Sequence, residues 1–373
     1  MAIKRGVSLY SYQQSQYLKD LNLEEQIAEV TSNLEGADGI EIIDEMSLRY
    51  PNPSDEFISN WFKWLDKYGA KAVTMDVGMD VLQFRDHVMT HEECAERLKQ
   101  DIKLAKKLGF SNVRVLSTTP LEVILMALPT AEKLDIRLGR EIHQPMHLQG
   151  RQVIEIFEHV EKTGTKHLGV VPDFGIFQFR PSDVLLEWFI RKGATEDATK
   201  ASIELCTLLD SGKAPFNPID TAFITAGNLR ADFKRFLVTG DCGQDIKETF
   251  EGVVNYAKDN LENPSQLDQI VVAEALMLSR TSAELMRPLV PIIISIHGKF
   301  NNMSEIPGQP GKYQDVSIDY VKPLKVLREE NYQGYLNSEY EGQRYFQDRG
   351  REFIKSEVEQ VRRHHEMLRR LMA

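Results

Sequence analysis

Several features that define common protein classes are scarce in this sequence. Its 373 residues include three cysteines, Cys94, Cys206 and Cys242, an odd number without CxxC spacing. This pattern excludes a disulfide framework and a zinc ribbon, and the thiols are expected to be small buried groups. No apolar run approaches the roughly 18 residues that span a membrane, and the N-terminal residues lack a signal-peptide run. The sequence therefore predicts a cytoplasmic protein without membrane contact.

Excess positive charge and the common catalytic motifs are also missing. The formal net charge is -11 and the pI is about 5.4, which disfavours nucleic-acid binding because phosphates require clustered Lys and Arg. GxGxxG, phosphate-cradling GKS or GKT, and GxSxG do not occur. Residues 91–94, HEEC, lack the second histidine of HExxH, since residue 95 is Ala. His364 and His365 lie among arginines and are predicted on a solvated helix face.

The sequence does contain short β-rich runs that alternate with stretches of helical periodicity, as in a parallel sheet built from βα units. Eight runs are present, and eight parallel strands close a (β/α)8 TIM barrel. The predicted strands are Val7 to Tyr12, Gly39 to Asp44, Lys71 to Val77, Asn112 to Ser117, Asp135 to His143, Leu168 to Asp173, Ile292 to His297 and Gly334 to Tyr340. The predicted helices between them include Leu23 to Leu34, Asp55 to Tyr68, His91 to Leu108, Arg151 to Lys162, Ile318 to Glu330 and Arg351 to Met372.

One interval is much longer than a βα unit allows. The numbers of Asp173 and His297 differ by 124, whereas a βαβ unit needs roughly 30 residues. We therefore expect a helical insertion at 179–288, between strands six and seven. Residues 1–178 would carry strands one to six, and 289–373 would carry the last two strands and the C-terminal helix. Because strand six ends at the barrel mouth, the insertion should start on that face, as a lid or a partner-docking surface.

The last four predicted strands each deliver one possible metal ligand near their carboxyl end. Since these ends meet at the barrel mouth, the four side chains can surround one ion. Three carboxylates and one imidazole suit Mn²⁺, Mg²⁺ or Co²⁺ better than a structural zinc, and Mn²⁺ is expected. The alternative for each carboxylate alone is a helix N-cap or a surface group. The candidate ligands are Glu141 in REIHQP, Asp173 in VVPDFG, His297 in IIISIHGKF and Glu339 in YLNSEYEG.

Strand alternation places these ligands on a common face, because side chains two residues apart point the same way. In the seventh strand, Ser295 and His297 are predicted to point inward and Ile294 outward. In the eighth, Asn337 and Glu339 share the inward face. Polar chemistry is therefore concentrated on one side of the sheet.

A histidine beside the ligands is the candidate general base. His143 follows Glu141 by two residues on the same face, and the ordinary pKa of histidine suits proton transfer near neutrality. The alternative is a group that orients a ligand, or a core histidine. His147 follows Pro145 in a loop, where a rim histidine is the ordinary interpretation. Glu339 is predicted to act in catalysis as well as in metal binding, and the residues predicted to contact substrate are Tyr12, Ser117, His147 and Lys299.

The ligand order Glu, Asp, His, Glu on a barrel resembles the xylose-isomerase-like family, which includes sugar isomerases, ketose 3-epimerases, inosose dehydratases and endonuclease IV. The resemblance covers the chain apart from the insertion. It implies a metal site at Glu141, Asp173, His297 and Glu339. Two departures from the family pattern narrow the range of expected activities. Ketose 3-epimerases usually have Glu-Pro at strand five and a His three residues after the strand-six Asp. This chain has Glu141-Ile142 and Ile176 at these positions. Endonuclease IV needs further histidine ligands and a basic surface.

The segments GVSLYSYQ, GIEIIDE and REIH resemble the alpha subunit of bacterial C-glycoside deglycosidases. That resemblance implies a sugar substrate already oxidised at C3, where the ketone acidifies the C2 proton. A base removes this proton and the resulting enolate expels the aglycone from C1, a β-elimination that cleaves a carbon–carbon bond. It also implies a small beta subunit in a hetero-oligomer. The alternatives are a metal-dependent isomerase, epimerase or inosose-type dehydratase acting on a free sugar, and a catalytically inactive sugar-binding subunit.

Overall fold

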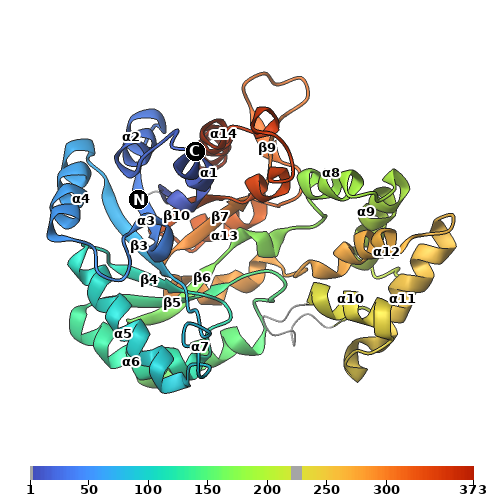
Figure 1. Ribbon diagram of the computed structural model, residues 1–373, viewed down its shortest axis with the longest axis horizontal. Helices are drawn as coiled ribbons and strands as arrows, with labels where there is room; N and C mark the ends of the chain where they lie inside the picture. The colour runs from blue at the N-terminus through green and yellow to red at the C-terminus, as the bar shows by residue number, and fades with distance from the viewer. Residues whose placement is uncertain (1–2, 220–228) are drawn as a thin grey trace.

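The computed structural model describes residues 3–219 and 229–373, and its centre is an eight-stranded parallel sheet rolled into a barrel (Figure 1). The hydrogen-bonded order is β6-β5-β4-β3-β2-β1-β10-β7. Bridges from Val170 to Ile293 and from Asp173 to His297 join the two ends of this order. The predicted barrel is thus confirmed. The barrel strands are β1 Lys4–Ser8, β2 Ala37–Ile43, β3 Lys71–Val77, β4 Asn112–Val115, β5 Arg137–Ile142, β6 Leu168–Pro172, β7 Ile296–Phe300 and β10 Tyr335–Tyr340, and a separate hairpin has β8 Met303–Glu305 and β9 Tyr313–Asp315.

Helices pack around the barrel, and α4 to α7 cover the strands of the N-terminal half in Figure 1. Their ends carry the expected local signals: Ser54 caps α4 by accepting a hydrogen bond from the Phe57 N–H, and Gly69 ends it at φ 65°. The helix α6, which contains Pro129, is additional to those predicted. The helices are α1 Gln13–Tyr17, α2 Leu23–Asn33, α3 Asp44–Ser47, α4 Asp55–Tyr68, α5 His91–Lys107, α6 Leu121–Leu134, α7 Arg151–Thr163, α13 Val321–Glu329 and α14 Glu357–Met372.

Two predicted strands are displaced. The first strand ends at Ser8, and a 3-10 turn, Leu9–Tyr12, follows it. The seventh strand begins at Ile296 rather than Ile292, because a 3-10 segment with two prolines, Ala283–Ile292, precedes it. The prediction that Ile294 points outward is wrong. Its side chain fills the space that Gly139 leaves inside the barrel, where an added Cβ would lie 2.3 Å from Ile294 Cδ1.

The main hydrophobic core lies between the barrel and its helices, and it extends to the C-terminal helix α14. The prediction that His364 and His365 lie on a solvated face is wrong, since both are buried. The His364 ring stacks on Phe300 at a centroid distance of 4.1 Å, and its Nε2 and Nδ1 lie 2.8 Å from the hydroxyls of Tyr320 and Ser338. Packing of this part of α14 against the barrel buries both rings in spite of the neighbouring arginines. Cys94 and Cys206 are buried as expected, and Cys242 is half-buried.

Between β6 and β7 the chain forms a group of helices beside the barrel, on the right in Figure 1. Two further hydrophobic clusters hold these helices together. The group joins the barrel through α8, whose Arg191 donates to the Tyr345 carbonyl and pairs with Asp348 in the segment after β10. Part of the predicted insertion, 220–228, lies outside the described residues. The helices are α8 Asp183–Arg191, α9 Glu196–Asp210, α10 Leu229–Thr239, α11 Gln244–Asn260 and α12 Gln266–Ala273.

Within the described ranges, no helix combines the length and the apolar character needed to cross a membrane.

Candidate metal centre

The four candidate ligands meet at the barrel mouth. Glu141 lies on β5, Asp173 directly follows β6, and His297 and Glu339 lie on β7 and β10. One potential ligand atom from each lies within 4.8 Å of those from the others, and all four residues are buried. Strand alternation explains the convergence, because these side chains occupy inward positions. Glu141, Asp173 and Glu339 lie at or directly after the carboxyl ends of their strands. The predicted strand-end position is wrong for His297, which is the second residue of β7 because this strand starts and ends later than predicted.

The contacts within this group favour a cation at its centre. His297 Nδ1 lies 3.1 Å from Glu141 Oε1 and 3.3 Å from Glu339 Oε2, yet neither Nδ1 nor Glu339 Oε2 has a hydrogen-bond partner in the part of the chain that the structure describes. Buried polar atoms without partners are costly, and a divalent ion bound by oxygen and imidazole ligands would satisfy both. The residues present therefore fit a divalent metal.

Charges shift the pKa values in this cluster in opposite directions. Burial alone would lower the pKa of His297, but the carboxylates of Glu339 and Glu41 hold it well above its ordinary value. Burial would raise the pKa of Glu141, whereas the Arg114 guanidinium and His297 lower it well below its ordinary value. For Asp173, burial prevails and raises the pKa. Without a bound cation, the negative charge of the site is therefore balanced only by its few positive neighbours.

His143 and Lys299 lie directly beside the ligands. The His143 side chain is 35% exposed, so a molecule at the mouth can reach it. Its Nδ1 lies 2.7 Å from the Gln144 carbonyl, and its Nε2 lies 2.6 Å from Lys299 Nζ. Since a carbonyl only accepts and an ammonium only donates, Nδ1 carries the proton and Nε2 the lone pair. Lys299 Nζ also contacts Asp173 Oδ2 at 3.1 Å and Glu341 Oε2 at 2.8 Å.

A second polar layer lies deeper in the barrel and was not identified from the sequence. Glu41 of β2 and Asp76 of β3 face His297 Nε2 at 3.1 and 3.8 Å. Arg114 of β4 pairs with Asp76 at 3.1 Å, and Asn337 of β10 donates to Glu41 Oε2 at 2.8 Å. Their inward positions on β2, β3 and β4 were the available signal. Single polar residues in otherwise apolar strands do not reveal where they meet.

The remaining predicted site residues are dispersed. Ser117 lies two residues beyond β4, half-buried, and its carbonyl accepts two hydrogen bonds from Arg140. His147 lies in the loop after β5, where its Nδ1 accepts from the Gln149 N–H. Tyr12 is fully buried in the core, and its charged neighbours, Glu29, Glu357 and Arg362, come from the outer helices α2 and α14. The structure therefore does not bring Tyr12 to the metal cluster.

A small cavity of about 60 Å³ connects the barrel mouth to the helical group. His143, Lys299 and Glu341 line its barrel side, and Arg230 and Glu274 line the other. Arg230 makes a two-pronged ion pair with Glu274, with N–O distances between 2.8 and 3.1 Å. The helices between β6 and β7 therefore wall the space next to the candidate catalytic residues.

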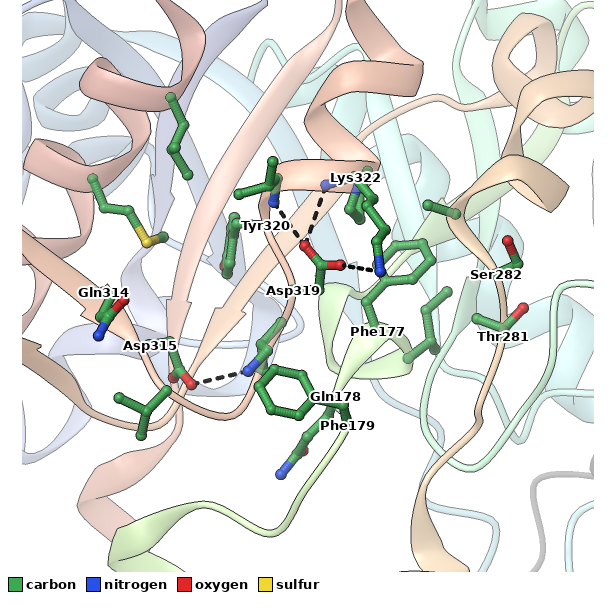
Figure 2. A pocket seen from close by; sticks show the side chains of 18 of the residues that line it. Phe177, Gln178, Phe179, Thr281, Ser282, Gln314, Asp315, Asp319, Tyr320 and Lys322 are labelled. Atoms are coloured by element: carbon green, nitrogen blue, oxygen red, sulfur yellow. Dashed lines mark hydrogen bonds and ion pairs between the residues drawn. The ribbon is translucent and has the colours of Figure 1, made fainter. Parts of the chain in front are cut away.

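A larger cavity, about 920 Å³, lies on another part of the surface (Figure 2). It runs between the segment after β6, which includes Phe177 and Phe179, and the start of α13. Its charged groups are already paired, since Asp319 accepts from two N–H groups at the start of α13 and contacts Lys322 Nζ at 3.3 Å. The predicted ligands and His143 lie outside its lining.

Comparison with known proteins confirms the resemblance to deglycosidase alpha subunits. The 3'-dehydrocarminate deglycosidase alpha subunit of Microbacterium sp. is 25% identical over 339 residues, 90% of this chain and 88% of the relative. A C-glycoside deglycosidase alpha subunit of Arthrobacter globiformis is 25% identical over 369 residues, covering 99% and 92%. A second one from that organism is 28% identical over 345 residues, covering 91% and 84%. No family model matches the chain.

Solved structures of sugar-phosphate isomerase/epimerase barrels share the fold. A sugar phosphate isomerase/epimerase from Parabacteroides distasonis has a TM-score of 0.50 at 11% identity, covering 100% of this chain and 96% of that one. D-psicose 3-epimerase in the presence of D-fructose has a TM-score of 0.51 at 12% identity, covering 99% of both. The IOLI protein with a binding zinc atom has a TM-score of 0.51 at 11% identity, covering 99% and 98%. At these identities the likeness concerns the fold alone.

Proposed function

We propose that this chain is the catalytic alpha subunit of a C-glycoside deglycosidase, a metal-dependent lyase that cleaves the carbon–carbon glycosidic bond of 3-oxo-C-glucosides. The observation that carries the proposal is the buried group of Glu141, Asp173, His297 and Glu339 at the barrel mouth, with His143 beside it. Similarity to curated deglycosidase alpha subunits over most of the chain supports the same reading.

Glu141, Asp173, His297 and Glu339 would hold one divalent ion, with Mn²⁺ the best candidate for this mostly oxygen donor set. When bound, such an ion supplies a Lewis acid that stabilises negative charge developing on a substrate carbonyl oxygen. The protein's own contribution is to bind the sugar at the mouth and to move protons at defined atoms.

His143 is the proposed base. Its Nδ1–H is held by the Gln144 carbonyl, which leaves the lone pair on Nε2, where it accepts from Lys299 Nζ at 2.6 Å. Nε2 would remove the proton from C2 of the oxidised sugar. The electron pair of this bond becomes the C1=C2 double bond, and the pair of the broken C1–carbon bond leaves with the aglycone. No water enters the reaction, and the aglycone carbon takes up one proton.

Lys299 lies where it can assist the proton transfer by His143. Its ammonium donates to His143 Nε2, so an incoming substrate must take over this contact before His143 can accept a proton. Lys299 would then donate a hydrogen bond to the substrate or a proton to the departing aglycone. Its contacts with Glu341 and Asp173 keep the ammonium next to the site. The helices that carry Arg230 and Glu274 stand next to this position and are the proposed contact region for the aglycone.

The proposal also includes a partner subunit and a location in the cell. The relatives are named alpha subunits, so we expect a small beta subunit in a hetero-oligomer. The helical group at 179–288 is proposed as a unit distinct from the barrel parts at 1–178 and 289–373. A cytoplasmic location remains a prediction from the sequence.

The deciding experiment is an assay of 3-oxo-C-glucosides with the chain alone and together with a candidate small subunit, before and after chelation and with Mn²⁺ restored. Release of the aglycone that needs Mn²⁺ is the expected result. Turnover of free ketoses without any action on C-glycosides would instead favour the isomerase or epimerase alternative. Metal binding without turnover of either substrate class would favour a binding subunit.

A further inference from the structure

The two ring nitrogens of His297 face two different groups of carboxylates, and only one of these two groups can belong to the metal site. Nδ1 faces Glu141 and Glu339, whereas Nε2 faces Glu41 at 3.1 Å and Asp76 at 3.8 Å. Each set has the geometry to hold an ion with His297. Which nitrogen binds the ion therefore has to be decided from the neighbouring charges.

The Nε2 side is already supplied with positive and hydrogen-bonding partners. The Arg114 guanidinium lies 3.1 Å from Asp76 Oδ2 and 3.9 Å from Glu141 Oε2, so it would repel an ion bound to Asp76 more strongly than an ion bound to Glu141. The Asn337 amide donates to Glu41 Oε2 at 2.8 Å and to Ser295 Oγ at 3.1 Å. Two carboxylate oxygens on this side, Glu41 Oε1 and Asp76 Oδ1, have no hydrogen bond among the described residues.

Glu41 Oε1 is the nearest acceptor to His297 Nε2, at 3.1 Å against 3.8 Å for Asp76 Oδ2. Glu41 Oε1 and His297 Nε2 are both buried, and both lack a hydrogen bond to any residue that the structure describes. When Nδ1 binds a metal ion, the proton of a neutral imidazole must reside on Nε2, where it needs an acceptor. A carboxylate that accepts this proton fixes the tautomer and the orientation of a metal-binding histidine.

We propose that Glu41 is a positioning residue for the metal site: it accepts the Nε2–H of His297 and thereby directs Nδ1 toward the ion. Asn337 holds Glu41 in place. Gly6 of β1 makes room for Asn337, since a Cβ at position 6 would lie 2.3 Å from Asn337 Oδ1. Contacts thus run from Gly6 on β1 to Asn337 on β10, then to Glu41 on β2 and to His297 on β7. Together they set the orientation of the His297 ring. This inference rests on the proposed metal site.

The test compares Mn²⁺ affinity of the wild-type chain with that of Glu41→Gln, by calorimetric titration after chelation. The amide removes the charge and disturbs the Asn337 contact, so affinity should fall about 10- to 100-fold. Glu357→Gln is the matched control, because Glu357 is equally buried but bonds to the backbone of Gln14 and Ser15, far from His297. It should leave Mn²⁺ affinity unchanged.

A second measurement needs no variant. In the wild-type chain loaded with diamagnetic Zn²⁺, ¹⁵N NMR should show the proton of His297 on Nε2 and the metal on Nδ1. The reverse assignment, or unchanged Mn²⁺ affinity in folded Glu41→Gln, would overturn the role of Glu41 while leaving the proposed lyase intact. Failure of the wild-type chain to bind any divalent ion would overturn both. If Glu41→Gln does not fold, the NMR assignment decides.

Discussion

Two buried acidic groups share the His297 ring, and they differ in what balances their charge. On the Nε2 side, Arg114 and Asn337 supply a cation and an amide donor to Asp76 and Glu41. The Nδ1 side has three carboxylates, Glu141, Asp173 and Glu339, and its positive neighbours are Lys299 at 3.1 Å from Asp173 and the more distant Arg114 at 3.9 Å from Glu141. This side therefore has the larger excess of negative charge, which a cation from solution would balance.

The difference also explains how the site can be rigid before an ion arrives. In the inner layer, Arg114 on β4 pairs with Asp76 and Asn337 on β10 donates to Glu41, so we expect the geometry of this layer not to depend on metal. The outer layer faces the mouth, where His143 is exposed and a ligand can enter. Some residues of the site should therefore affect both metal binding and activity when they are replaced, whereas others should affect only one of these two properties.

The largest effect should follow loss of a ligand on the Nδ1 side. His297→Ala or Glu339→Ala should abolish both stoichiometric Mn²⁺ binding and turnover, because three donors cannot hold the ion as four do. Metal analysis of the purified variants beside the wild-type chain measures the first effect, and the aglycone-release assay the second. Full retention of bound metal in either variant would break the assignment of this side as the metal site.

His143→Ala should separate metal binding from catalysis. Turnover should fall by about 10²- to 10⁴-fold, the usual cost of losing a general base, while Mn²⁺ content stays at the wild-type level. Exchange of the substrate C2 proton with deuterated solvent should stop in the same variant. His159→Ala, a partly exposed histidine on α7, is the control. Loss of metal in His143→Ala would make His143 a ligand, and undiminished turnover would transfer the base to Glu339 or Glu141.

Removal of the ion should lower stability measurably. A ligand present at 100 times its Kd stabilises the folded state by about 2.7 kcal/mol, so chelation should lower the melting temperature by several degrees. The closely spaced carboxylates on the Nδ1 side are the physical reason, because the ion relieves the mutual repulsion that Lys299 and Arg114 offset only in part. Calorimetric scans with and without chelator measure the shift. Glu339→Ala should show none, and an equal melting temperature for the wild-type chain in both conditions would contradict the prediction.

The smallest effect concerns the support of the Nε2 side. Gly6→Ala should destabilise the fold by about 1–3 kcal/mol, since the added Cβ would lie 2.3 Å from Asn337 Oδ1 and 2.7 Å from the Gly39 carbonyl oxygen. Gly78→Ala is the matched control, because a Cβ there meets nothing within 4 Å. Urea unfolding gives both free energies. Equal stability of the two variants would show that Asn337 has more freedom than the structure indicates.

Local patterns predicted several elements to the residue. The helix at Asp55–Tyr68 and the strand at Lys71–Val77 have the predicted bounds, because a capping residue and strand alternation mark them directly. The C-terminal helix begins at Glu357, six residues later than predicted, since Ser356 provides its N-cap. Periodicity located the element, and the cap fixed its start.

The sequence by itself determined the barrel and the four ligand types on or next to its last four strands, because the alternation of side chains and the succession of strands and helices can be read along the chain. Only the tertiary structure decided which inward residues meet. The late start of β7 fixes the height of His297 between Glu41 and Glu339, and closure of the barrel brings Lys299 against His143. Tyr12, on a 3-10 turn, faces the outer helices instead. These placements depend on the stagger of strands far apart in the chain, which no local pattern encodes.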